Sequence, residues 1–209
     1  MTLWAYLALS VVAYVVLTRM INKYKKLAEV ERLTGLAENG DSKAQYDLAI
    51  CYFNGKGVAK DDTGAVAWLG KAAEHDNAEA QRVLGVCYDQ GRGLQPDIAK
   101  ALVWWKKAAQ GGDSEGQRIL GNCFYNGKGV AKDAEQAVVW FRKAAEQGNA
   151  KAQTCLGMCY NNGEGVQKDD VQAYKWLTLA SAGDWDARKL RDYVASLMTR
   201  EQIEKARQL

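Results

Sequence analysis

The side chains best able to do chemistry in this sequence are five cysteines. Four recur every 36 residues, at Cys51, Cys87, Cys123 and Cys159, and Cys155 is the fifth. Such a row could ligate a metal or relay disulfides. Equivalent positions on packed helices lie about 10 Å apart, however, and the Cα atoms of a disulfide must lie within about 7 Å. No histidine or second cysteine pair completes a ligand set beside Cys155 and Cys159. We therefore interpret the cysteines as small buried apolar residues.

The other candidates for chemistry are the single histidine and a set of paired glycines. His75 has no partner histidine or paired nucleophile, and it lies where a predicted helix ends, a position that favours interaction with the helix dipole. The glycine pairs, such as Gly55 and Gly57, follow helices and precede no G-K-[ST] sequence, so they indicate turns rather than a phosphate loop. We predict no catalytic residue, metal site, cofactor or small-molecule substrate. The alternative, an enzyme with a new thiol or carboxylate site, would require the fold to gather a polar cluster.

The elements that position these residues come from a 36-residue internal repeat. Each unit predicts a first helix, roughly 41–53 in the first unit, a glycine loop, and a second helix capped by Asp61. The tryptophans at 68, 104 and 140 are predicted to fill core sites that bridge two units. Units of this kind cannot bury both apolar faces alone, so they must stack into a solenoid. The positions that mark the repeat are Leu48, Leu84, Leu120 and Leu156; Tyr52, Tyr88, Phe124 and Tyr160; Asp61, Asp97, Asp133 and Asp169; and Trp68, Trp104, Trp140 and Trp176.

The predicted fold class is all-α, an α-solenoid of four full helix–loop–helix repeats with atypical capping helices, preceded by one transmembrane helix. The solenoid domain is expected to span residues 25–209. Its predicted subdivisions are repeats at about 41–76, 77–112, 113–148 and 149–183 and a C-terminal cap at 184–209.

This pattern resembles the Sel1-like repeat family, relatives of the tetratricopeptide repeats. The stretches that carry the resemblance are L-G-V-C-Y-D-Q-G-R-G-L from Leu84 to Leu94 and V-V-W-F-R-K-A-A-E-Q-G from Val138 to Gly148. The resemblance covers about residues 28–209. It implies a curved α-solenoid that scaffolds protein complexes without catalysis.

The N-terminal segment is predicted to be a membrane anchor. Residues 3–17 are uncharged, and extension to Ile21 gives about 20 residues, the length of a membrane-spanning helix. The extension is interrupted only by Arg19, and all four basic residues of positions 1–26 follow the uncharged run of 3–17, which predicts a cytoplasmic solenoid. We thus expect residues 1–24 to form the anchor and its basic flank in a single-pass protein of the bacterial inner membrane. The alternative is a secreted or periplasmic repeat protein after cleavage of a signal peptide. The residues assigned to the anchor are Leu3, Trp4, Tyr6 and Tyr14.

The charge distribution argues against nucleic acid as the partner. The chain carries a net charge of +3, but four basic residues lie before position 27, leaving 24 of the 28 basic residues against 25 acidic ones. A near-neutral body without a basic run is not typical of nucleic-acid binding. We therefore expect a protein partner.

The expected docking surface is the face of the first helices on which the repeats differ from one another. Core positions repeat, whereas a face that meets a non-repeating partner need not. We predict a membrane-anchored scaffold, adaptor or accessory subunit that binds its partner on the concave face. The alternative is a structural subunit of a membrane complex, held mainly by its transmembrane helix. The predicted partner-binding residues are Tyr46, Ile50, Phe53, Arg82, Asp89, Arg118, Asn122 and Tyr125.

Overall fold

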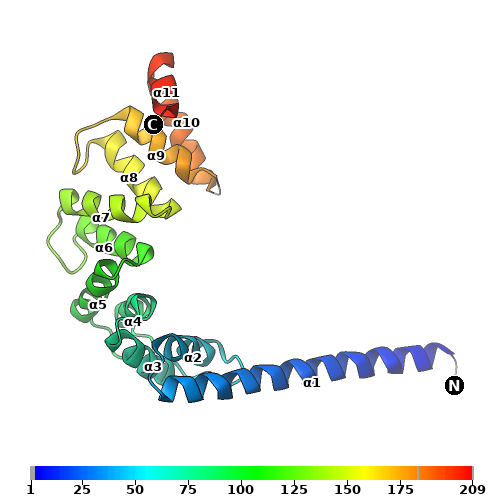
Figure 1. The fold of residues 1–209 in the computed structure, drawn as a ribbon. Coiled ribbons are helices and arrows are strands. Elements are labelled where there is room, and N and C mark those ends of the chain that lie inside the picture. Colours follow the sequence, from blue (N-terminus) through cyan, green and yellow to red (C-terminus); the bar gives the residue numbers. More distant parts are fainter. Residues whose placement is uncertain (1–2, 183, 209) are drawn as a thin grey trace.

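The computed structural model describes the backbone of residues 3–182 and 184–208, and the side chains of this range from Tyr14 onward. Within these residues the chain forms eleven helices and no strand (Figure 1). The predicted all-α solenoid is thus confirmed. The helices are α1 (Leu3–Glu38), α2 (Ser42–Asn54), α3 (Asp62–Glu74), α4 (Ala78–Gln90), α5 (Ile98–Gln110), α6 (Ser114–Asn126), α7 (Ala134–Glu146), α8 (Ala150–Asn162), α9 (Asp170–Ala180), α10 (Trp185–Leu197) and α11 (Arg200–Arg207).

Each repeat begins and ends its helices with the residues that the sequence indicated. The side chain of Asp61 accepts hydrogen bonds from the backbone N–H groups of Thr63 and Gly64, which confirms the predicted cap of α3. The first helices end at a glycine in the left-handed conformation, such as Gly55 with φ 63°. Within the predicted C-terminal cap, Thr199 and Gln202 form a capping box at the start of α11.

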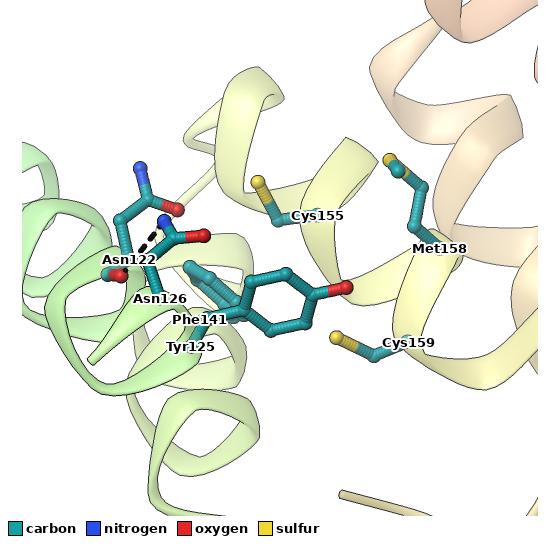
Figure 2. Close-up of a pocket in the computed structure, with 7 residues that line it drawn as sticks. All are labelled: Asn122, Tyr125, Asn126, Phe141, Cys155, Met158 and Cys159. Atoms are coloured by element: carbon teal, nitrogen blue, oxygen red, sulfur yellow. Dashed lines mark hydrogen bonds between the residues drawn. The ribbon is translucent and has the colours of Figure 1, made fainter. Parts of the chain in front are cut away.

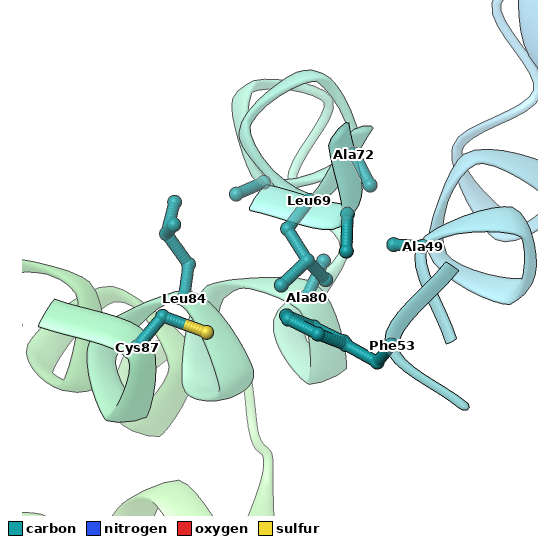
Figure 3. Close-up of a cluster of buried hydrophobic side chains, with 9 residues drawn as sticks. Ala49, Phe53, Leu69, Ala72, Ala80, Leu84 and Cys87 are labelled. Atoms are coloured by element: carbon teal, nitrogen blue, oxygen red, sulfur yellow. The ribbon is translucent and has the colours of Figure 1, made fainter. Parts of the chain in front are cut away.

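The core of each repeat is a large side chain on the second helix packed against a small residue on the first. Phe141 of α7 is 1% exposed and faces Gly121 of α6, where an added Cβ would lie 2.6 Å from the ring. Figure 3 shows the corresponding cluster of the first two repeats, with Leu69 of α3 at its centre. The pairs that share this arrangement are Ala49 with Leu69, Gly85 with Trp105, Gly121 with Phe141 and Gly157 with Leu177.

The predicted tryptophan core is only partly correct. Trp68, Trp104 and Trp140 are half-buried, and the fully buried side chain of each second helix is the next residue along the chain. A lysine three residues later covers each of the three indole rings, with Nζ 4.0–4.5 Å from the ring centroid. The amphipathic lysine and tryptophan pairs therefore lie at the edge of the core, where the ring is buried on one side and covered by a cation on the other.

A row of buried glutamines joins each repeat to the one before it. The side-chain Nε2 of Gln81 donates to the carbonyl oxygen of Ala73 at 3.0 Å, and Gln117 does the same to Ala109 at 3.1 Å. Gln45 and Gln153 make the equivalent bonds. The last turn of a second helix is thus tied to the following first helix.

The C-terminal part of α1 takes the place of a second helix from a preceding repeat. Gly57 of the first loop packs against the Lys26 carbonyl and Val30 of α1, as Gly93 packs against Asp62 and Val66 of α3 one repeat later. The remainder of α1 extends away from the stack (Figure 1).

The predicted membrane anchor is contradicted. In the part of the chain that the structure describes, no helix combines the length and the apolar character needed to cross a membrane. The side chains of α1 are described from Tyr14, and this part of the helix carries charged residues from Arg19 onward, which leaves it no apolar run long enough to span a bilayer. The single-pass membrane location was therefore wrong. Of the residues assigned to the anchor, Tyr14 lies in α1 and is 70% exposed, whereas the side chains of Leu3, Trp4 and Tyr6 lie outside the described part.

Candidate partner-binding site

The helices α2, α4, α6 and α8 form one face of the stack, here called the first-helix face. The first helices α4 and α6 contact each other directly on this face. The docking surface that the sequence predicts lies on these helices.

Two cavities open on this face, and both are built from the same repeat positions. One lies between α4 and α6 and has a volume of about 340 Å³, and the other lies between α6 and α8 and has a volume of about 160 Å³. Asn122 and Asn126 of α6 line both, so they form the wall between them. The first cavity is also lined by Val86, Asp89, Gln90, Trp105, Ile119, Cys123 and Lys128, and the second by Tyr125, Phe141, Cys155, Met158 and Cys159.

The buried core side chain of the second helix forms part of the wall of each cavity. Trp105 lines the first cavity, and its indole Nε1 is buried without a hydrogen-bond partner. Phe141 lines the second, with its ring centroid 6.4 Å from that of Tyr125. Figure 2 shows the sulfur atoms of Cys155, Met158 and Cys159 on the other side of this cavity. Aromatic rings and sulfur atoms form an apolar, polarisable lining.

The rims of these cavities are held by contacts between one repeat and the loop of the next. Asp89 forms an ion pair with Lys128, with an oxygen–nitrogen distance of 2.7 Å. One repeat later, the Tyr125 hydroxyl donates a hydrogen bond to Glu164, and this bond raises the pKa of Tyr125 to about 12. The sequence analysis missed Lys128 and Glu164 because they lie between turn glycines. Each lies 39 residues after its partner near the end of a first helix, and this constant separation is the signal that could have indicated the two contacts.

The predicted partner-binding residues fall into three groups. Asp89, Asn122 and Tyr125 come together at the two cavities. The three residues from α2 pack with the core cluster of the first repeats, and they are Tyr46, Ile50 and Phe53. The two arginines already carry carboxylate partners, because Arg82 lies 3.0 Å from Asp113 and Arg118 lies 2.6 Å from Glu115.

The Glu115 carboxylate links two repeats. It accepts hydrogen bonds from Arg118 on its own helix and from Asn149, the N-cap residue of α8, at 3.0 Å. The Arg118 guanidinium, together with Asn149, lowers the pKa of Glu115 from 4.5 to about 2.

Because its pKa is lower in the folded state, Glu115 should stabilise the fold fully above about pH 4.5 and lose this effect as the pH falls toward 2. We expect Glu115→Gln to lower the melting temperature at neutral pH and to flatten its decline between pH 4.5 and 2. Thermal unfolding of both proteins across this range measures the effect. An unchanged pH profile would contradict the assigned ion pair.

The cysteines are all free, and four of them are buried. Burial raises the pKa of Cys87 and Cys123 to about 11 and that of Cys159 to about 12. Within the described residues, no three histidine, cysteine or acidic side chains are placed to hold a metal ion. The four buried thiols, Cys51, Cys87, Cys123 and Cys159, lie in the hydrophobic core.

Thiol reactivity should distinguish Cys155 from the other cysteines. Cys155 is half-buried and lines the second cavity, whereas the other four thiols are buried. We expect Ellman's reagent to modify one thiol of the native protein well before the rest, since the thiolate must be accessible to react. Cys155→Ser should remove this early reaction. A fast reaction that persists in the variant would show that another cysteine is accessible.

The Sel1 repeat family model matches residues 42–77, 78–113, 114–149 and 150–184. Among solved structures, a protective antigen present in uropathogenic Escherichia coli strains, with an SLR fold, is 40% identical, with a TM-score of 0.76 over 85% of this chain and 38% of that one. A Sel1 repeat protein from Oxalobacter formigenes is 35% identical, with a TM-score of 0.77 over 83% of this chain and 49% of that one. The chain thus spans less than half the length of these two relatives. No curated protein matches the sequence.

Proposed function

Because the chain belongs to the Sel1 repeat family, whose members generally mediate protein–protein interactions, we propose that it is an adaptor that binds a partner protein along the first-helix face. Residues 25–209 would act as one solenoid domain. The role requires binding and no catalytic residue.

The observation that carries this proposal is the pair of cavities on the first-helix face. They occur where the repeats differ in sequence, at Asp89 and Tyr125 on the rims and at Asn122 between them. Packing within the stack requires repetition at core positions, whereas these positions vary and leave space open. Concave sites with an apolar lining and a few polar groups are typical of binding sites.

Site-specific photo-crosslinking in cells tests the proposal. A benzophenone amino acid at Asn122, which lines both cavities, should yield a discrete adduct with the partner. The matched control is the same amino acid at Lys106, which is exposed on the second helix α5. We expect an adduct from position 122 and none of that size from position 106. No adduct at position 122, or equal adducts at both, would show that the partner does not dock on this face.

A further inference from the structure

Three successive repeats build the same site, and the first is filled by the chain itself. Phe53 is the counterpart of Asp89 and Tyr125, and its side chain is 5% exposed. Figure 3 shows its ring extending from the end of α2 toward Cys87 of α4, next to Leu69. Cys87 and Leu69 occupy the repeat positions of the residues that line the two open cavities.

The side chain of Arg92 covers the Phe53 ring in the filled site. The Arg92 guanidinium lies 3.9 Å from the centroid of the Phe53 ring, and its Nη2 donates to the Phe53 carbonyl oxygen at 3.3 Å. The ring is therefore buried in an apolar pocket and covered by a cation–π contact. The first repeat thus shows that this site accepts an aromatic ring.

The next two repeats leave space open at the same site. Asp89 pairs with Lys128 at the rim, and the cavity has a volume of about 340 Å³. Tyr125 packs partly against Phe141 and is held at its hydroxyl by Glu164, and about 160 Å³ remains open beside its ring. An apolar cavity of about 150 Å³ is large enough to bind benzene, so each open site can take an aromatic ring.

We propose that the partner inserts one aromatic side chain into each of the two open cavities, as Phe53 does within the first repeat. This inference rests on the proposed adaptor function. Trp105 and Phe141 offer ring contacts, and Met158 with the neighbouring thiols offers sulfur contacts in the second cavity. Lys128, whose Nζ lies 5.8 Å from the centroid of Trp105, is placed to cover a ring in the first cavity as Arg92 covers Phe53.

The spacing of the cavities defines the partner segment. The two cavities lie on either side of α6, whose Asn122 and Asn126 line both, so they are about 10 Å apart, the diameter of a helix. A polyproline II segment rises about 3.1 Å per residue and has three residues per turn, so side chains three residues apart project from the same side about 9 Å apart. The partner is therefore an extended segment with two aromatic residues separated by two others.

Fluorescein-labelled peptides of the sequence Ser-Pro-Phe-Pro-Pro-Phe-Pro-Ser test the proposal by fluorescence anisotropy. Versions with alanine at either or both phenylalanines are the peptide controls. We expect the wild-type chain to bind the two-phenylalanine peptide at least about tenfold more tightly than either single-phenylalanine peptide, as loss of one buried ring implies. Equal affinity for these peptides, or no binding of the two-phenylalanine peptide, would overturn the proposal without any variant.

Two double variants introduce the phenylalanine and arginine of the first repeat, Phe53 and Arg92, at the equivalent positions of the two open sites. Asp89→Phe with Lys128→Arg should fill the first cavity, and Tyr125→Phe with Glu164→Arg should close the second. Each should reduce affinity for the two-phenylalanine peptide to that for a single-phenylalanine peptide. Lys106→Phe adds an aromatic residue to the exposed side of α5 and should leave affinity unchanged. Full peptide affinity in both folded double variants would overturn the proposal.

The photo-crosslink at position 122 separates this inference from the proposed function. If the adduct forms equally in the wild type and in both closed variants, the partner docks on the first-helix face without filling the cavities, and only the aromatic proposal fails. If the wild type gives no adduct but still discriminates the peptides, the cavities accept aromatic rings and the adaptor proposal fails.

Discussion

Phe141→Ala is expected to lower the free energy of unfolding by about 3–5 kcal/mol, the range for truncating a fully buried aromatic side chain. The ring is 1% exposed and lies between α6, α7 and α8 at the centre of its core cluster. Its opposite partner is Gly121, which has no side chain that could move into the space. Urea denaturation followed by circular dichroism measures the loss.

The neighbouring residue supplies a matched control. Trp140 is larger than Phe141 but half-buried, and the Lys143 ammonium lies 4.4 Å from its ring centroid. We expect Trp140→Ala to cost about 1–2 kcal/mol, because only part of its apolar surface is removed from water. If Trp140→Ala is more destabilising than Phe141→Ala, the centre of the core lies at the tryptophan position and not at Phe141.

This pair of variants also marks the limit of what sequence periodicity could predict about the core. The helical periodicity of the repeat places both Trp140 and Phe141 on the apolar side of the second helix. It does not show which of these two adjacent residues is the more buried. The deciding contact is with Gly121, on another helix. A small residue recurs at the position of Gly121 in every repeat, which indicates that the paired helices pack closely but does not identify the side chain that it faces.

Other parts of the fold were predictable because one local rule decides each of them. Asp61 caps α3 and Gly55 ends α2 in the left-handed conformation, so the helix boundaries follow from capping and left-handed turn preferences. The role of α1 was misjudged because its apolar N-terminal run dominated the interpretation. Comparing residues 30, 33 and 37 with 66, 69 and 73 would have revealed a second helix at the repeat spacing.

The candidate site was only partly predictable because variability between repeats has two causes. At Asp89 and Tyr125 the repeats differ beside open cavities, where we propose that the partner binds. At the repeat position of Tyr46 and Thr154, the second and third repeats instead carry Arg82 and Arg118, and both arginines pair with carboxylates of this chain, Asp113 and Glu115. A sequence read one repeat at a time cannot distinguish a residue that varies with its neighbour from one that faces a partner.

Gly165→Ala is expected to destabilise the fold by about 3 kcal/mol or more, because two separate penalties combine at this position. Gly165 has φ 70°, a left-handed conformation that costs a non-glycine residue about 1–2 kcal/mol. An added Cβ would also collide with the backbone carbonyl of Ala134 at the start of α7, and backbone cannot rotate away as a side chain can. The loop would have to move away from the preceding repeat, and the contact of Glu164 with Tyr125 would be lost with it.

Gly148→Ala separates the two penalties, since Gly148 has φ 83° but nothing within 4 Å of an added Cβ. It should therefore show only the conformational cost of about 1–2 kcal/mol. The difference between the two variants in urea denaturation measures how closely the loop of one repeat approaches the second helix of the repeat before it. Equal losses would mean that this loop does not rest on α7. The loop that carries Glu164 would then not be fixed against α7, and its hydrogen bond with Tyr125 could not hold that ring at the rim of the second cavity.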